Sequence, residues 1–210
     1  MNNMKVAFAG SSGSGKTTLV KFVQQELGLE WISGSAGDLY TPEDVSYLQD
    51  MLKHPGGGHH GVIAYSALNS TFAIQNQQLL LLRRTELFTK YNNFVTDRSP
   101  ADNLTYFVSQ CGYHPEVTDQ IASDFIDNCK KAWGLLTHVV YIKAVQPNAV
   151  ENNGSRISNK YYQKAIDAQF EMWIDTIFKY VPGPRILCLD YWDLDKRKEA
   201  VLAFLKQSGI

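Results

Sequence analysis

The stretch Gly10–Thr17, GSSGSGKT, fits G-x-x-x-x-G-K-[ST], the phosphate-binding loop called Walker A. Its three glycines let the backbone curl so that successive N–H groups face phosphate oxygens, and a helix beginning near Lys16 adds its positive dipole end. Lys16 can reach the β- and γ-phosphates, while the Thr17 hydroxyl can supply one ligand to a bridging Mg²⁺. The predicted nucleotide-binding residues are Gly10, Ser11, Ser12, Gly13, Ser14, Gly15, Lys16, Thr17 and Thr18.

The flanking residues distinguish this loop from a Gly/Ser-rich turn that matches by chance. Lys5–Ala9, immediately before it, is a short apolar run of the length expected for a buried parallel strand. After it, Leu19, Val20 and Val23 recur at helical spacing, and Gly28 is where we expect the helix to end. Strand, loop and helix therefore come in the required order.

A second chemical feature is Asp97, which follows the apolar run Asn93–Thr96. A strand ending in an acid is the general form of Walker B, whose carboxylate holds Mg²⁺ opposite the loop hydroxyl. Because turns also favour Asp, the assignment depends on its pairing with the phosphate-binding loop. We assign the metal to Thr17 and Asp97. Arg98, the next residue, can neutralise a transferring phosphoryl group or bind an acceptor phosphate bidentately.

A third candidate is Asp38, which follows an expected second strand, Leu29–Ser33, and the segment Gly34–Gly37. The carboxyl ends of parallel strands face the ligand crevice, so Asp38 could accept the acceptor's proton. A helix N-cap or a turn explains an Asp at this position equally well. Asp97 in a double role is the other candidate base, and both stay open.

The chain between these features predicts helices that line an acceptor pocket. Thr41 and Pro42 predict a helix start, and residues 64 to 90 predict one long helix. The expected apolar face of that helix consists of Leu68, Phe72, Leu79 and Leu82. Gln75 and Gln78 are candidates to bind a nucleobase edge, because an amide offers a donor and an acceptor in one plane. The other polar residues, Gln77, Arg83 and Arg84, are expected to face solvent. We interpret the cluster Pro55–Gly61 as a loop over this pocket.

A polar segment follows an expected fourth strand, Thr137–Ile142, and leads into a helix from about residue 159 to 180. A mobile loop carrying an arginine could close over the donor and exclude water from the reaction. We predict a lid at about residues 146 to 158, with Arg156 as its charged residue and Lys160 as second choice.

Composition limits the remaining function classes. The 210 residues suit one α/β domain, and a net charge of −1 gives no overall basic field for nucleic acid. The three cysteines, Cys111, Cys129 and Cys188, include no C-x-x-C pair and are expected to be reduced and to fill the core. No apolar run approaches the ~20 residues of a membrane span, so we expect a cytoplasmic protein.

Together these stretches resemble the P-loop nucleoside and nucleotide kinases over almost the whole chain. The likeness is to the small AAA-annotated ATP-binding proteins that include the nicotinamide-riboside kinase domain. Deoxynucleoside kinases carry a similar acid-Arg-Ser triplet, here Asp97–Ser99, after a glutamine-bearing helix. The resemblance implies a three-layer α/β sandwich with helices on both faces of a five-stranded parallel sheet of order 2-3-1-4-5. It also implies ATP and Mg²⁺ as cofactors. Relatives usually place an acid directly after the second strand, where this chain has Gly34.

The function so implied is transfer of the ATP γ-phosphoryl group to a (deoxy)nucleoside or a nucleoside monophosphate. The expected catalytic residues are Lys16, Asp38, Asp97, Arg98 and Arg156. The expected substrate-binding residues are Asp38, Gln75, Gln78 and Arg98. Two alternatives remain, a kinase acting on a hydroxymethyl base within DNA and a nucleotide-dependent regulatory ATPase. The first would need a basic channel, for which candidates are Lys53, His59, His60, Arg83, Arg84 and Lys90. A homodimer is compatible with either.

Overall fold

The computed structural model describes residues 3–44, 46, 48, 53, 58–143 and 160–207. Its strands form one parallel sheet in the order β2-β3-β1-β4-β5, as predicted. The strands are β1 (Met4–Ala9), β2 (Glu30–Trp31), β3 (Asn93–Thr96), β4 (His138–Ile142) and β5 (Arg185–Leu189). The central strand β1 is buried along its whole length, and all its residues except Lys5 are apolar, because helices cover both of its faces.

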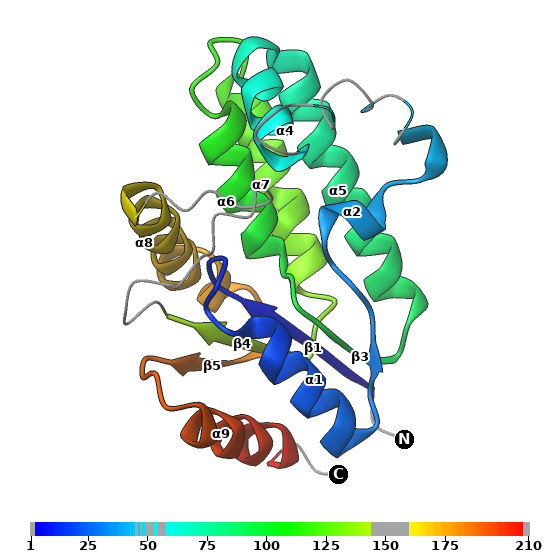
Figure 1. Ribbon diagram of the computed structural model, residues 1–210, viewed down its shortest axis with the longest axis vertical. Helices are drawn as coiled ribbons and strands as arrows, with labels where there is room; N and C mark the ends of the chain where they lie inside the picture. Colours follow the sequence, from blue (N-terminus) through cyan, green and yellow to red (C-terminus); the bar gives the residue numbers. More distant parts are fainter. Residues whose placement is uncertain are drawn as a thin grey trace.

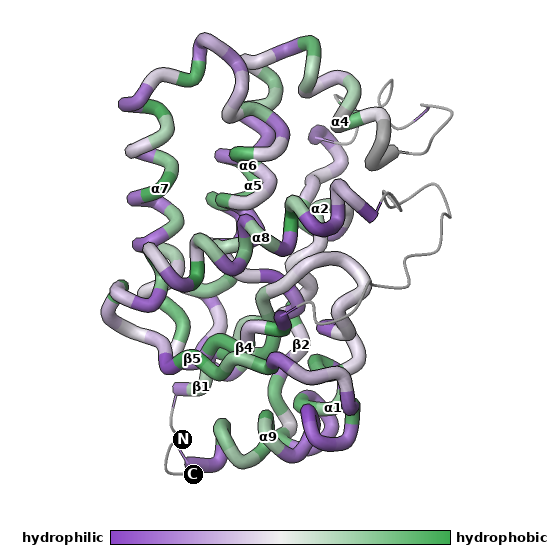
Figure 2. The backbone as a smooth tube through the Cα atoms, turned by 90° about the vertical axis from the view of Figure 1, so that its left-hand side faces the viewer, coloured by the Kyte–Doolittle hydropathy of each residue, from purple (hydrophilic) through white to green (hydrophobic). Residues whose placement is uncertain are grey.

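Helices form the two outer layers of the sandwich. They are α1 (Lys16–Leu27), α2 (Ala36–Leu39), α4 (Gly58–Leu68), α5 (Ser70–Lys90), α6 (Pro100–Cys111), α7 (Asp119–Trp133), α8 (Lys160–Thr176) and α9 (Leu194–Lys206), with a 3₁₀ turn η1 (Phe178–Tyr180). Figure 1 shows α1 and α9 on one face of the sheet, at the bottom of the view, and α5, α6 and α7 on the other. In Figure 2 the hydrophobic strands β4 and β5 lie between these two layers.

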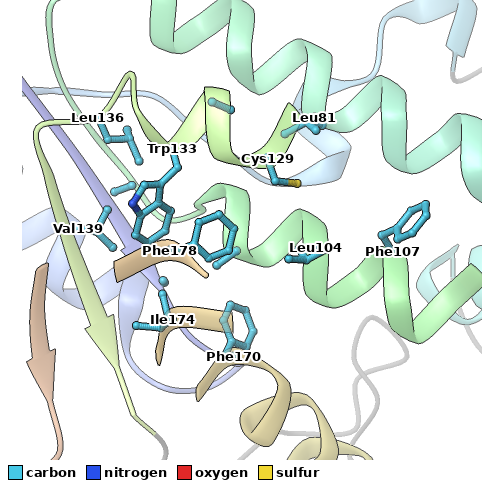
Figure 3. Packing of buried hydrophobic residues seen from close by; sticks show 14 of the residues in the cluster. Leu81, Leu104, Phe107, Cys129, Trp133, Leu136, Val139, Phe170, Ile174 and Phe178 are labelled. Carbon is cyan, nitrogen blue, oxygen red and sulfur yellow. The ribbon is translucent and has the colours of Figure 1, made fainter. Parts of the chain in front are cut away.

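Alternate residues of β1 supply the two cores, because successive side chains of a strand point to opposite faces. Val6 and Phe8 pack with α1 and α9, whereas Ala7 and Ala9 pack with the helices of the opposite layer. The second core is the larger one, and Figure 3 shows Trp133 against Phe178 at its centre. Their rings stack with centroids 4.4 Å apart. This core packs α6, α7 and α8 against one another and against the sheet.

The predicted helix of residues 64 to 90 is wrong in one respect, since the structure has two helices there. Asn69 separates α4 from α5, and its side-chain oxygen accepts the Phe72 N–H at 2.9 Å, so Asn69 is the N-cap of α5. The prediction missed this N-cap because the apolar residues continue at helical spacing on both sides of it. Leu68 and Leu82 do not lie on the buried face, because they are 88% and 54% exposed. The backbone of the predicted Pro55–Gly61 loop is already helical from Gly58.

The helix start predicted at Thr41 is confirmed, whereas the prediction that all three cysteines fill the core is wrong for Cys188. Thr41 does begin a helical segment, since its hydroxyl accepts the Asp44 N–H while the Asp44 carboxylate accepts the Thr41 N–H. Cys111 is buried, and burial raises its pKa to about 12, whereas Cys188 is exposed on the edge strand β5 and does not fill the core. Among the described residues, no helix has the length and apolar character needed to cross a membrane.

Candidate active site

The Walker A loop connects β1 to α1 and is closed around its own lysine. Gly10, Gly13 and Gly15 have φ values of 137°, 80° and 96°, a region that side chains disfavour. At Gly10 a Cβ would also lie 2.6 Å from the Ile142 carbonyl oxygen, so β4 passes too close for any other residue. The Lys16 ammonium is nearly buried and donates to the carbonyls of Gly10 and Ser11 at 2.7 and 2.6 Å.

Thr17 and Asp97 meet at the mouth of this loop, as the sequence predicted. The pairing of β1 with β3 brings the two ends together, and the Thr17 hydroxyl donates to Asp97 Oδ2 at 3.5 Å. Hydroxyl and carboxylate oxygens are the ligands that Mg²⁺ prefers, and it usually takes few of them from the protein and the rest from phosphates and water. The described residues contain no group of three or more His, Cys, Asp or Glu side chains that could hold a metal alone. The pair therefore fits a metal ion shared with a bound nucleotide.

Arg98 is held at the same edge of the sheet by a capped helix start. Its Nη1 donates to Asp102 Oδ1 at 3.0 Å, while Asp102 Oδ2 accepts the Ser99 N–H and hydroxyl. The residue three positions after the N-cap thus closes a capping box and also orients the arginine. Burial, the largest single effect, would lower the pKa of Arg98, but the charge and hydrogen bond of Asp102 act together with Tyr106 and Asp97 to raise it. Arg98 remains a cation that is partly open to solvent.

Gly34 joins the two sides of the site through its backbone. Its N–H donates to Asp97 Oδ1 at 3.3 Å, and its carbonyl accepts from Nε and Nη2 of Arg84 at 3.1 and 2.7 Å. A Cβ at Gly34 would lie 2.6 Å from Cβ of Arg98. Position 34, three residues after β2, is therefore glycine because Arg98 occupies the space that a side chain would need.

The expectation that Gln77 and Arg84 face solvent is wrong, since both are buried on α5. Arg84 also donates to Asn103 of α6, and burial lowers its pKa to about 10. Gln77 donates from Nε2 to Gln110 Oε1 at 2.7 Å. Asn103 Nδ2 and Thr105 Oγ1 are buried without a hydrogen-bond partner among the described residues. The two helices thus enclose a polar layer next to Gly34.

Sequence reasoning missed this layer, although one signal was present. Gln77 and Arg84 are seven residues apart, two helical turns, and so share a face with the buried Leu80 and Leu81. Gln75 and Gln78, the predicted base-binding residues, are both exposed. Their role stays a prediction, and the buried amides on this helix are those of Asn76 and Gln77.

Asp38 lies in α2, and two serines hold its carboxylate. It accepts hydrogen bonds from the hydroxyls of Ser33 and Ser35 at 2.5 and 2.7 Å. These hydrogen bonds lower the pKa of Asp38, which makes the carboxylate a weaker base. The geometry favours the turn interpretation, and the catalytic role of Asp38 stays a prediction.

Asp167, on α8, is a further acid at the phosphate-binding loop, and nothing in the sequence pointed to it. Burial raises its pKa, while a hydrogen bond with Ser11 and the charge of Lys16 act in the opposite direction.

The predicted lid of residues 146 to 158, with Arg156, lies outside the described residues. Lys160, the second lid candidate, is the first residue of α8 and is exposed, with Nζ 5.1 Å from the Tyr161 ring centroid.

Comparison with known proteins identifies this arrangement. A search of curated protein sequences found no match. Solved structures with similar folds include the M. mycoides deoxyadenosine kinase with bound dCTP (TM-score 0.60, 15% identity, covering 97% of this chain and 100% of that chain). They also include YorR of Bacillus subtilis in complex with phosphorylated GDP (0.57, 13%, 97% and 96%) and the thymidylate kinase of Candida albicans (0.58, 13%, 98% and 92%).

At these identities the structural matches establish the fold, which is that of the P-loop kinases. The sequence model of the deoxynucleoside kinase family, by contrast, matches residues 6–207. That span contains the Walker A loop, the Asp97–Ser99 triplet and every strand of the sheet but the first residues of β1. The chain therefore belongs to the deoxynucleoside kinase family, and it is a phosphotransferase of the nucleoside and nucleotide kinase type.

Proposed function

We propose that the protein transfers the γ-phosphoryl group of ATP, with Mg²⁺, to a (deoxy)nucleoside hydroxyl or to a nucleoside monophosphate. The observation that carries this proposal is the meeting of Thr17 and Asp97 beside the Walker A loop, with Arg98 at the same edge. A donor-phosphate site and a cation that can reach an acceptor thus share one crevice, as phosphoryl transfer requires.

Each residue at the loop has a role in this scheme. The N–H groups of Gly10–Thr17 hold the donor phosphates, and Lys16 exchanges its contacts with the loop carbonyls for phosphate oxygens. Bound Mg²⁺, on Thr17 and Asp97, would neutralise charge on the β- and γ-phosphates. Arg98 covers the charge that spreads over the transferring group, because the fork held by Asp102 is already oriented. Arg156 would add a second cation from the lid.

The polar layer of α5 and α6 supports a nucleobase as the recognised part of the acceptor. A buried amide nitrogen without a partner is destabilising by about 1–3 kcal/mol, and Asn103 Nδ2 is such a group. A base edge supplies the missing acceptor. Gln77 lies on the facing helix and can donate and accept in one plane, and Arg84 fixes Asn103 from the other side.

The acceptor's proton has two candidate destinations in this scheme. Asp38 is restrained by two serine hydroxyls that lower its pKa. Asp97 is at the crevice but is also the metal carboxylate. A monophosphate acceptor needs no base, since its oxygen is already anionic, so the acceptor class decides whether either carboxylate takes the proton.

The test is ATP consumption with Mg²⁺ against ribo- and deoxynucleosides, their monophosphates, nicotinamide riboside and DNA with hydroxymethylated bases. Turnover on one free nucleoside or monophosphate, lost in Lys16→Ala, is the expected result. Turnover on DNA alone would favour the DNA-kinase alternative, although Arg84 is buried and unavailable to a channel and Arg83 pairs with Glu86 at 3.3 Å. Hydrolysis that no acceptor stimulates would favour a regulatory ATPase.

A further inference from the structure

Arg197 of α9 is an arginine buried beneath the Walker A loop. It is 3% exposed, and its Nη1 donates to the Ser14 carbonyl at 3.0 Å. Its Nε donates to the Tyr191 carbonyl at 2.6 Å, in the segment Asp190–Asp193 between β5 and α9. The guanidinium carbon also lies 5.3 Å from the centre of the Trp192 ring. One side chain therefore ties the loop to a segment almost 180 residues away.

The positive charge of Arg197 has no carboxylate partner in the part of the chain that the structure describes. Both bonded acceptors are neutral carbonyls, and no ion pair of Arg197 occurs within the described part of the chain. Nη2 is buried without a hydrogen-bond partner there, and burial lowers the pKa of Arg197. Placing a cation in such surroundings is unfavourable on its own. A negatively charged ligand nearby would compensate for it, and the Walker A loop is where such a ligand binds.

We propose that Arg197 is a positioning residue for the donor nucleotide, acting through the backbone of the Walker A loop. Ser14 stands between Gly13 and Gly15, two residues with positive φ, so its carbonyl can rotate readily when nothing holds it. Rotation of one peptide plane turns the following N–H group as well. By fixing the Ser14 carbonyl outward, Arg197 keeps the Gly15 N–H directed at the phosphates. The inference rests on the proposed function, because it takes the ligand of this loop to be the donor.

The position of Arg197 confines its effect to the donor. It lies on α9, in the layer that α9 forms with α1, whereas Gln77 and Asn103 lie on α5 and α6 across the sheet (Figure 1). On its other side, the guanidinium faces the ring of Trp192, which is 44% exposed. A change at Arg197 should therefore alter donor binding and leave acceptor binding as it is.

The experiment compares MgADP binding by calorimetry in the wild type and in Arg197→Met, which keeps the length but loses every donor. We expect the Kd for MgADP to rise about tenfold, the effect of losing a hydrogen bond from a charged group. We expect the KM for ATP to rise in parallel and the KM for the acceptor to stay within about twofold. Arg197→Lys, which keeps the charge without the fork, should fall between the two.

The matched control is Arg185→Met, because Arg185 also stacks on an aromatic ring of this layer, Phe204, at 5.0 Å. Arg185 begins β5, at the opposite end of the sheet from the loop. Arg185→Met should therefore leave the Kd for MgADP and the KM for ATP unchanged. A folded Arg197→Met that binds MgADP like the wild type overturns the inference alone, as does an equal rise in both KM values. If Arg197→Met does not fold, Arg197→Lys is decisive in the same way. A wild type that binds no MgADP overturns the proposed function instead.

Discussion

The donor side and the acceptor side of the proposed site, the Walker A loop and the polar layer of α5 and α6, are built in different ways. On the donor side, most of the groups that would bind the phosphates are backbone N–H groups of one continuous loop, and Thr17 and Asp97 add side chains. On the acceptor side, side chains from α5 and α6 meet across 19 and 33 residues of sequence, and Arg84 joins them to the backbone at Gly34. A loop of glycines needs local conformation, whereas a layer of buried amides needs two helices in register. The donor side should therefore depend mainly on the backbone conformation of its loop, which Arg197 helps to hold, and the acceptor side on the identity of its side chains.

The largest expected effect is that of Asp97→Asn on the donor side. The amide keeps the shape and can still accept from the Gly34 N–H, but it loses the charge that a metal requires. We expect kcat/KM to fall by about a hundredfold or more, with the melting temperature little changed. Steady-state kinetics across a range of Mg²⁺ concentrations measures this. Asp38→Asn is the matched control, and an equal loss there would show that the charge of Asp38 matters as much as that of Asp97.

The difference between the two sides also explains what the sequence could predict. The Walker A loop and the pairing of Thr17 with Asp97 follow from short contiguous patterns, and the strand order follows from the family resemblance that those patterns carry. Gln77, Arg84 and Asn103 look like ordinary helix-surface residues, because their burial depends on which helix faces which. Arg197 and Asp167 come to the loop from the last two long helices, and no local pattern encodes that contact.

Gly34→Ala tests the point at which the two sides meet. The new methyl group would lie 2.6 Å from Cβ of Arg98 and 3.0 Å from Oγ1 of Thr96, neither of which is a flexible end. Since Arg84 also holds the Gly34 carbonyl, relief must move the backbone. We expect a loss of about 1–3 kcal/mol in the free energy of unfolding and a rise in both donor and acceptor KM. Chemical denaturation and kinetics measure these.

The control for that substitution is Gly37→Ala, three residues further on. A Cβ there meets nothing within 4 Å, so the same change in chemistry has space. It should leave stability within about 0.5 kcal/mol of the wild type. Equal losses in the two variants would mean that the α2 segment as a whole, rather than the contact with Arg98, is sensitive to alanine.

Gln77→Leu sharpens the comparison from the acceptor side. Leucine fills a similar volume but removes the amide that bonds Gln110 and, in the proposed function, a base edge. We expect the acceptor KM to rise about tenfold while the KM for ATP is unchanged, the reverse of the pattern expected at Arg197. Gln75→Leu, on the exposed side of the same helix, should have little effect. If Gln75→Leu has the larger effect, the base-binding amides are those predicted from the sequence spacing.

The smallest expected effect is that of Asp167→Asn, which would show how an acidic side chain influences the donor side. Burial raises the pKa of Asp167, so its charge appears at a higher pH than for an ordinary aspartate. As the pH rises through that pKa, a negative charge forms beside Ser11 and repels the donor phosphates. The wild type should therefore bind MgADP more weakly as the pH rises, and Asp167→Asn should lack this part of the pH dependence.

The measurement is the Kd for MgADP of both proteins across a range of pH. Because the nucleotide titrates equally in both, the ratio of the two Kd values isolates the effect of Asp167. We expect that ratio to be near one at low pH and to reach about two- to fivefold above the pKa. A ratio that stays constant with pH would place the carboxylate too far from the phosphates to influence them.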